Sequence, residues 1–169
     1  MKKYDVVIGI DPDVDKSGVA YVEPESRILE AMSLTFADLL DYLQELRDIL
    51  TERGQTFVVV VEAGWLNKAH WHVGKGGSAA RSAAIGNHTG RNHEVGRKIV
   101  EMCRHYGIEV VEQPPLRKMW KGRDGKITHE ELQHFTGITG KTNQETRDAA
   151  LLAWEYAGLP IRIKNQYNK

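Results

Sequence analysis

The sequence contains a single cysteine, Cys103, among its 169 residues. One thiol excludes an intrachain disulfide, and a chain without disulfides fits a reducing compartment such as the cytoplasm. No apolar run approaches the ~20 residues that a membrane-spanning helix needs. Charged Asp5 and Asp11 interrupt any apolar core of a signal peptide near the start of the chain. We therefore expect a cytoplasmic protein that has no membrane partner.

The sequence also lacks internal repeats, low-complexity segments and any stretch that reads as a linker. Hydrophobic residues make up 41% and charged residues 27%, which is ordinary for a globular domain that buries a single core. We expect one mixed α/β domain over residues 1–160, followed by a polar tail over residues 161–169.

Net charge is also lacking, because 23 Lys and Arg balance 23 Asp and Glu. Taken alone, this neutrality argues against a nucleic-acid partner. The charges are unevenly distributed, however: residues 1–63 carry 6 basic and 13 acidic side chains, whereas residues 64–126 carry 12 basic and 5 acidic ones. A basic middle third is typical of a nucleic-acid-binding surface, although these cations could equally be ordinary solvated surface.

The amino-terminal part of the sequence reads as a sheet. Apolar, β-branched runs separated by turn residues predict strands at residues 4–11, 18–23 and 27–33, joined as an antiparallel meander. A helix over residues 35–54 follows, because its leucines recur at helical spacing. The next run, TFVVVVE at residues 56–62, is continuously apolar, as in a strand buried on both faces, and the crossover makes it parallel to the first strand.

The rest of the chain predicts one more strand, at residues 108–111, and three more helices. We expect a helix that begins near Ser78 and is well defined from Asn92 onward, a short helix capped by Thr128, and a last helix that begins near Thr142. The predicted fold is therefore α/β: a five-stranded mixed sheet, with an antiparallel three-strand meander and two parallel strands, flanked by helices. Glycines in residues 64–92 predict a mobile loop before the second helix.

Four acids fall where this fold would bring them together. Asp11 and Glu62 end two neighbouring parallel strands at the same sheet edge, and Glu145 and Asp148 share one face of the last helix. Clustered carboxylates repel one another unless a cation joins them. Oxygen-only ligand sets suit Mg²⁺ or Mn²⁺, and two such ions per site can activate water and stabilise the leaving oxygen of a phosphodiester.

Each acid also has a structural interpretation. Asp11 could start the following turn as an Asx motif, and Glu62 could be a solvent-facing strand end. Glu145 could complete a capping box with Thr142, and Asp148 could be favoured by the helix dipole. The seven histidines and one cysteine fit no compact zinc-finger spacing.

The motifs IGIDP-turn-SGVAYV, VVVVE, a basic helix with Arg91, Pro115 followed by Trp120-Lys121, and ETRDAALLA together resemble a known family. Over residues 4–158 the chain resembles the RuvC-like Holliday junction resolvases of the RNase H-like superfamily. Two features depart from the family: Asp13 replaces a usual glycine, and the stretch at residues 64–92 looks longer.

The resemblance implies metal ligation by Asp11, Glu62 and Asp148, with Glu145 as a fourth acid. It places Lys121 and Lys126 near the scissile phosphate, so that six residues are candidate catalytic groups. It also implies a homodimer that cuts opposed strands of a four-way DNA junction and leaves 5′-phosphate ends. Candidate DNA contacts in the basic third are Lys68, Trp71, Lys75, Arg81, Arg91, Arg117 and Lys118.

Three functions remain open from the sequence. The first is a divalent-metal-dependent, structure-selective DNA endonuclease acting on branched DNA. The second is another RNase H-like nuclease that cuts RNA·DNA hybrids or flaps. The third is a non-catalytic nucleic-acid-binding module of the same fold.

Overall fold

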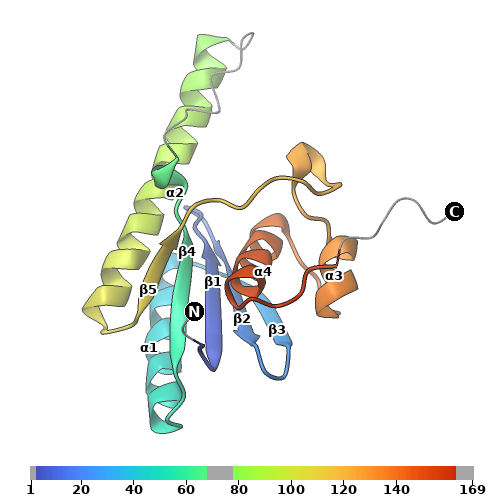
Figure 1. Ribbon diagram of the computed structural model, residues 1–169. Coiled ribbons are helices and arrows are strands. Elements are labelled where there is room, and N and C mark those ends of the chain that lie inside the picture. Colours follow the sequence, from blue (N-terminus) through green and yellow to red (C-terminus); the bar gives the residue numbers. More distant parts are fainter. Residues whose placement is uncertain (1–2, 68–77, 163–169) are drawn as a thin grey trace, which may run out of the picture.

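A computed structural model describes residues 3–67 and 78–162. In Figure 1 a central sheet separates two helical layers, with α1 and α2 on one side and α4 and α3 on the other. None of the helices in these two ranges is both long and apolar enough to cross a membrane.

The sheet has the predicted topology. Its strand order is β3-β2-β1-β4-β5; β1, β2 and β3 form an antiparallel meander, and β4 and β5 add parallel strands beside β1. This confirms the predicted fold class. The strands are β1 (Val6–Asp11), β2 (Ser17–Glu23), β3 (Ile28–Leu34), β4 (Phe57–Glu62) and β5 (Val110–Gln113).

The helices begin at polar caps. Thr35, Ser78, Thr128 and Asn143 each accept a hydrogen bond from a backbone amide of the first turn that follows. The elements are α1 (Phe36–Glu52), α2 (Ala79–His105), α3 (His129–Thr136), α4 (Gln144–Tyr156) and the 3₁₀ turns η1 (Gly64–Leu66) and η2 (Arg123–Gly125).

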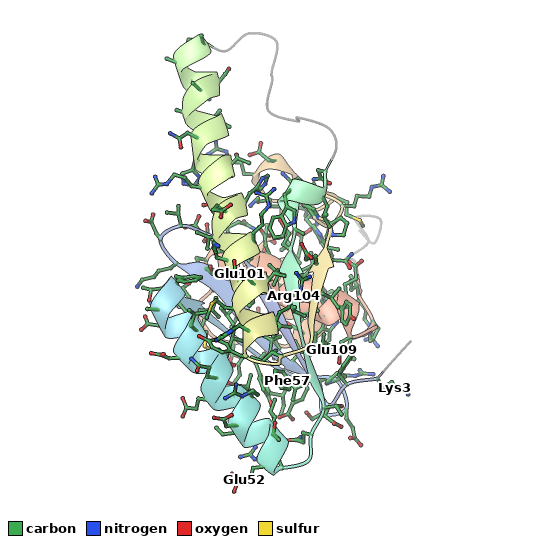
Figure 2. The ribbon with its side chains drawn as sticks, turned by 90° about the vertical axis from the view of Figure 1, so that its left-hand side faces the viewer. Lys3, Glu52, Phe57, Glu101, Arg104 and Glu109 are labelled. Carbon is green, nitrogen blue, oxygen red and sulfur yellow. The ribbon has the colours of Figure 1, made fainter. Side chains whose placement is uncertain are left out.

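Strand β1 serves both layers because its side chains alternate between the two faces of the sheet. Ile8 and Ile10 are buried against α1 and α2, whereas Val7 is buried with the residues of α4. Figure 2 shows α1 and α2 lying together across the first of these faces. By the same alternation, Gly9 and Asp11 belong to the α4 face, which decides where the candidate site forms.

Several strand boundaries differ from the predicted ones by one or two residues, and part of the predicted loop is helical. The fifth strand begins at Val110 rather than residue 108, because the amide of Ile108 still donates to the Cys103 carbonyl at the end of α2. The glycines favoured a mobile loop throughout residues 64–92, but residues 79–92 are helical, since α2 runs unbroken from its Ser78 cap. The beginning of this helix near Ser78 is confirmed; residues 68–77 lie outside the described ranges.

Helix α2 has two unlike halves. From Ile99 to Cys103 it is buried against the sheet, while its amino-terminal half extends beyond the sheet in Figure 1. Most side chains in this projecting half, residues 79–91, are exposed, including Ile85. The helix therefore forms a wall at the carboxyl ends of β1 and β4.

Candidate active site

The candidate site lies where β1 and β4 end. Ile10 pairs with Val61 in the parallel ladder, so Asp11 and Glu62 follow at neighbouring positions on one edge. Val58 and Val60 are buried on the α4 face, and Glu62 continues this alternation. Both acids are thus on the face that α4 covers.

Two glycines allow α4 to approach these strand ends closely. A Cβ atom at Gly9 would lie 2.3 Å from the Ala149 carbonyl oxygen, and one at Gly18 would lie 2.0 Å from that of Glu145. Any larger residue would push the helix away. Because Gly18 pairs with Asp11, the close contact places the first turn of α4 directly beside that acid.

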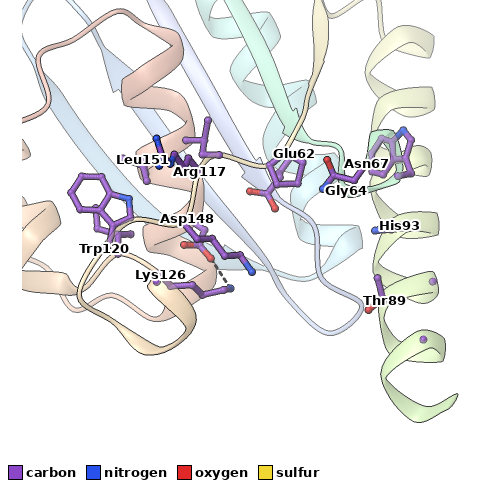
Figure 3. A pocket seen from close by; sticks show the side chains of 18 of the residues that line it. Glu62, Gly64, Asn67, Thr89, His93, Arg117, Trp120, Lys126, Asp148 and Leu151 are labelled. Carbon is purple, nitrogen blue, oxygen red and sulfur yellow. Dashed lines mark hydrogen bonds and ion pairs between the residues drawn. The ribbon is translucent and has the colours of Figure 1, made fainter. Parts of the chain in front are cut away.

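Asp148 is the most fully bonded of the four acids. Its Oδ2 accepts an ion-paired hydrogen bond from Lys126 Nζ at 2.8 Å, drawn as a dashed line in Figure 3. Its Oδ1 accepts one from Gln144 Nε2 at 2.7 Å. Arg147 donates in turn to the Gln144 side-chain oxygen and to the Ile127 carbonyl. This network ties α4 to the segment before α3.

The pKa values of Asp11 and Glu62 depend on burial and on the charges of the neighbouring acids. Burial raises the pKa of Asp11 well above its ordinary value, and the charges of Glu62, Asp148 and Glu145 raise it further, against the opposing charge of Lys126. Burial and Asp148 likewise raise the pKa of Glu62. Within residues 3–67 and 78–162, no side chain or amide donates a hydrogen bond to either carboxylate.

Lys126 is the cation that faces this cluster most directly. Burial lowers its pKa, but the hydrogen bond to Asp148 and the charges of Asp148, Asp11 and Glu62 outweigh burial, so the pKa is raised overall. The ammonium group therefore stays protonated at neutral pH and balances part of the negative charge.

The donor chemistry fits a hard divalent cation, because all four groups are carboxylates. In the part of the chain that the structure describes, however, no group of three or more His, Cys, Asp or Glu side chains is arranged so that it could hold a metal ion. Lys126 and Gln144 occupy both oxygens of Asp148. The acids share one edge, but they do not form a closed ligand set.

A cleft of about 1000 Å³ is lined by Glu62 and Asp148, whereas Asp11 and Glu145 are not among its lining residues. In Figure 3 Glu62 and Asp148 lie at its base, with His93 and Thr89 of α2 on one side and Trp120 on the other. Cations lie on both walls. Those that line the cleft are Arg97 from α2 and Arg117, Lys118 and Lys126 from the segment between β5 and α3.

The structure places the other predicted residues in different environments. Lys121 is exposed and outside the cleft lining, and its amide donates to Glu131. Arg81 and Arg91 are exposed on the projecting half of α2, beyond the lining. The other predicted DNA contacts, Lys68, Trp71 and Lys75, lie outside the described residues.

Two structural interpretations of the acids do not hold. Asp11 does not form the Asx turn; Asp13 does, by accepting a hydrogen bond from the Asp15 amide at 2.9 Å. The predicted capping box with Thr142 was also wrong, because the box is formed by Asn143 and Thr146 instead. Glu145, one position short of that box, makes no capping contact.

The three tryptophans in the described ranges, Trp65, Trp120 and Trp154, all pack against other side chains. Trp154 is 1% exposed, and Trp120 stacks on Phe135 with ring centroids 6.0 Å apart. Trp65 donates to Glu112 at 3.1 Å and lies against α2.

Sequence reasoning missed the residues that support the acids. Gln144 stands four positions before Asp148, which is the spacing of neighbours on a helix and could have identified it. The tight approach at Gly18 and the contact of Asn92 with Asp13 join distant segments, so neither has a local sequence signal.

No protein-family model and no curated protein matches the chain. Among solved structures, it is similar to Thermus thermophilus RuvC in complex with a Holliday junction substrate, with a TM-score of 0.52 and 16% identity over 90% of this chain and 92% of that one.

A second structure of Thermus thermophilus RuvC has a TM-score of 0.44 at 16% identity, covering 90% of this chain and 96% of that one. Fowlpox virus resolvase in complex with Holliday junction DNA also has a TM-score of 0.44, at 12% identity, covering 90% of this chain and 97% of that one. The fold assignment rests on the RuvC complex with the higher score. The chain thus has the RNase H-like fold of RuvC, as the sequence resemblance predicted.

Proposed function

We propose that this protein is a divalent-metal-dependent, structure-selective DNA endonuclease that hydrolyses phosphodiester bonds of branched DNA. Its preferred substrate is a four-way junction, which a homodimer cuts in opposed strands, leaving 5′-phosphate ends. One observation carries the proposal: Asp11 and Glu62 end adjacent strands without hydrogen-bond donors among the described residues, and Glu62, together with Asp148, lines a cleft with cations on both walls.

The cofactor in this proposal is Mg²⁺ or Mn²⁺, with two ions per site held by Asp11, Glu62, Asp148 and Glu145. Bound ions would activate a water molecule and stabilise the leaving oxygen. Each oxygen of Asp148 accepts one hydrogen bond, from Lys126 or Gln144, and keeps a second lone pair with which it could bind a cation. Burial and the charges of neighbouring acids raise the pKa values of Asp11 and Glu62, and a bound cation would relieve the repulsion among these acids while displacing any proton that they hold.

The two lysines predicted to lie near the scissile phosphate have different roles in this proposal. Lys126 lies in the cleft beside Asp148, and its protonated amine can bind an oxygen of the scissile phosphate. Lys121 is exposed nearby on the same segment, where it can contact the DNA backbone.

The DNA-binding surface in this proposal extends from the cleft along α2. Arg117 and Lys118 lie at the cleft, where they can neutralise phosphates next to the cut. Arg81 and Arg91 on the projecting half of α2 can bind a more distant arm of the junction. Lys68, Trp71 and Lys75 belong to the segment between η1 and α2, and the proposal includes them as further DNA contacts.

The proposal is tested with a panel of synthetic substrates: a four-way junction, the matched linear duplex, a flap and an RNA·DNA hybrid, each with Mg²⁺ or EDTA. We expect Mg²⁺-dependent, paired incision of the junction and little cleavage of the duplex. Preferential cleavage of the hybrid or flap would assign another RNase H-like nuclease. Binding of the junction without cleavage of any substrate would indicate a binding module. Light scattering at micromolar concentration should give twice the chain mass; a monomer would contradict paired incision.

A further inference from the structure

The turn between β1 and β2 is fastened to α2 by one side chain. Asn92 Oδ1 accepts a hydrogen bond from the Val14 amide at 3.0 Å, and its Nδ2 donates to Asp13 Oδ2 at 3.1 Å. The two bonded residues are separated in sequence by 78 positions in the first bond and by 79 in the second. Asn92 uses both ends of its amide, so its contact fixes the orientation of the turn as well as its distance from the helix.

The turn is internally braced as well. The other oxygen of Asp13, Oδ1, accepts from the Asp15 amide, and the Asp13 amide donates to Ser17 Oγ at 3.2 Å. The Asp13 carboxylate therefore joins the internal fold of the turn to its anchor on α2. A glycine at this position, as in the resembled family, could not make either side-chain contact.

A second contact between α2 and the β1–β2 turn lies one helical turn after Asn92, at Gly96. A Cβ atom at Gly96 would lie 3.1 Å from Pro12 Cγ and 2.4 Å from the Trp65 ring, so α2 packs tightly on the residue that follows Asp11. Asn92 and Gly96 are four positions apart and thus on one face of α2. The backbone directly after Asp11 is held from that face.

We propose that Asn92 is a positioning residue: through Asp13 and Val14 it holds the turn after Asp11, so that the Asp11 carboxylate faces Glu62 and can share a cation with it. This inference rests on the proposed metal-dependent function. Asn92 stands where the projecting half of α2 meets its buried half.

The two side chains allow a reciprocal exchange. Asn92→Asp alone places a carboxylate against that of Asp13. Asp13→Asn alone cannot accept from the Asp15 amide and from Asn92 at the same time. In the double variant Asp13→Asn/Asn92→Asp, the carboxylate at position 92 accepts from the Val14 amide and from the new amide at position 13, whose oxygen still accepts from Asp15. All three hydrogen bonds are restored with the same total charge.

The matched control lies at the opposite end of β1. Asp5 accepts hydrogen bonds from the amide and hydroxyl of Thr56, which fastens β1 to β4 far from the candidate site. Asp5→Asn weakens a comparable set of hydrogen bonds on the same strand. It therefore shows how far a general loss of sheet stability changes Mn²⁺ affinity.

The experiment measures Mn²⁺ affinity by calorimetry and amide hydrogen exchange in the turn, both on the full chain without DNA. We expect Asn92→Asp to weaken Mn²⁺ binding by roughly 10- to 100-fold, the usual effect of losing a residue that orients a ligand. It should also speed exchange in residues 13–15. The exchanged double variant should return to within about threefold of wild type, and Asp5→Asn should leave Mn²⁺ affinity unchanged.

The outcomes separate this inference from the proposed function. Mn²⁺ affinity that is unaltered in Asn92→Asp, or that stays low in the double variant although the turn is again protected from exchange, would overturn the positioning role alone. A wild-type chain that binds no Mn²⁺ would overturn the proposed metal site, and the inference with it. Weak binding in Asp5→Asn as well would reduce the role of Asn92 to general stabilisation.

Discussion

The two ends of the β1–β4 strand pair carry acids in opposite circumstances. At the amino end, the exposed Asp5 accepts hydrogen bonds from the Thr56 amide at 2.7 Å and its hydroxyl at 2.8 Å, and these bonds lower the pKa of Asp5. At the carboxyl end, burial and neighbouring acids raise the pKa of Asp11 and Glu62, and no described group donates to either.

The difference separates an acid that the fold stabilises in its charged form from the acids that the proposed function assigns to cation binding. Asp5 is stabilised in its charged form by the fold itself, so nothing further is needed to keep it ionised. Asp11 and Glu62 are held together at a cost to the folded state, because burial and repulsion both disfavour their charged forms. A bound cation would offset this cost, which is the electrostatic argument for the proposed metal site.

The largest effect is expected for cleavage. Asp11→Asn should lower Mg²⁺-dependent incision of a four-way junction by at least about 100-fold, more than is usual for the loss of a residue that merely orients a ligand. Asp5→Asn should cleave at the wild-type rate. Gel assays measure both rates, and binding in EDTA should be alike because the basic side chains are intact. If Asp11→Asn cleaved the junction at the wild-type rate, the proposed metal-binding role of Asp11 would be wrong, and the two strand ends would not differ in function.

The next effect concerns the close contact that brings α4 to the carboxyl end. Gly18→Ala should lower the free energy of unfolding by about 1–3 kcal/mol, because its Cβ would meet the Glu145 carbonyl and force α4 outward. Gly86→Ala is the control: a Cβ there meets nothing within 4 Å, so it should stabilise α2 by roughly 0.5–1 kcal/mol. Urea denaturation measures both, and a neutral Gly18→Ala would mean that α4 is not held against β2.

The smallest effect is a pH dependence of opposite sign at the two ends. A raised carboxyl pKa in the folded state means that stability falls as pH rises from the ordinary value through the raised one. In EDTA, Asp11→Asn should therefore be more stable than wild type at pH 7 by on the order of 1 kcal/mol, the size of one carboxylate repulsion in water. The difference should vanish below the ordinary pKa of an aspartate.

Asp5 should behave in the reverse sense. Its lowered pKa contributes stability above the ordinary value, and that contribution is lost as pH falls through the lowered one. Asp5→Asn should thus be less stable than wild type at pH 7 and approach it in acid. Thermal unfolding from pH 3 to 8 measures both curves, and parallel curves for the two variants would contradict the assigned environments.

Most of the fold could be predicted from local patterns. Alternation and β-branched runs located the strands, and the capping residues Thr35, Ser78 and Thr128 marked three helix starts correctly. The α4 cap was misassigned because Thr142 and Asn143 are both good caps, and only the tertiary contacts of Thr142 with His129 and Arg147 distinguish them. The cap at Ser78 and the glycines of residues 64–92 gave conflicting signals, one for a helix and the other for a mobile loop. The structure agrees with the cap, because α2 continues unbroken from Ser78 into its buried half.

The sequence by itself determined that Asp11 and Glu62 end parallel strands on one edge, because strand order and the two-residue alternation of side chains follow from the hydrophobic pattern. It also determined the cationic middle third. Only the tertiary structure decided that Lys126 and Gln144 bind Asp148 and that Asn92 fastens the turn after Asp11. Such contacts join residues distant in sequence, and they depend on packing distances of a few ångströms that no local pattern encodes.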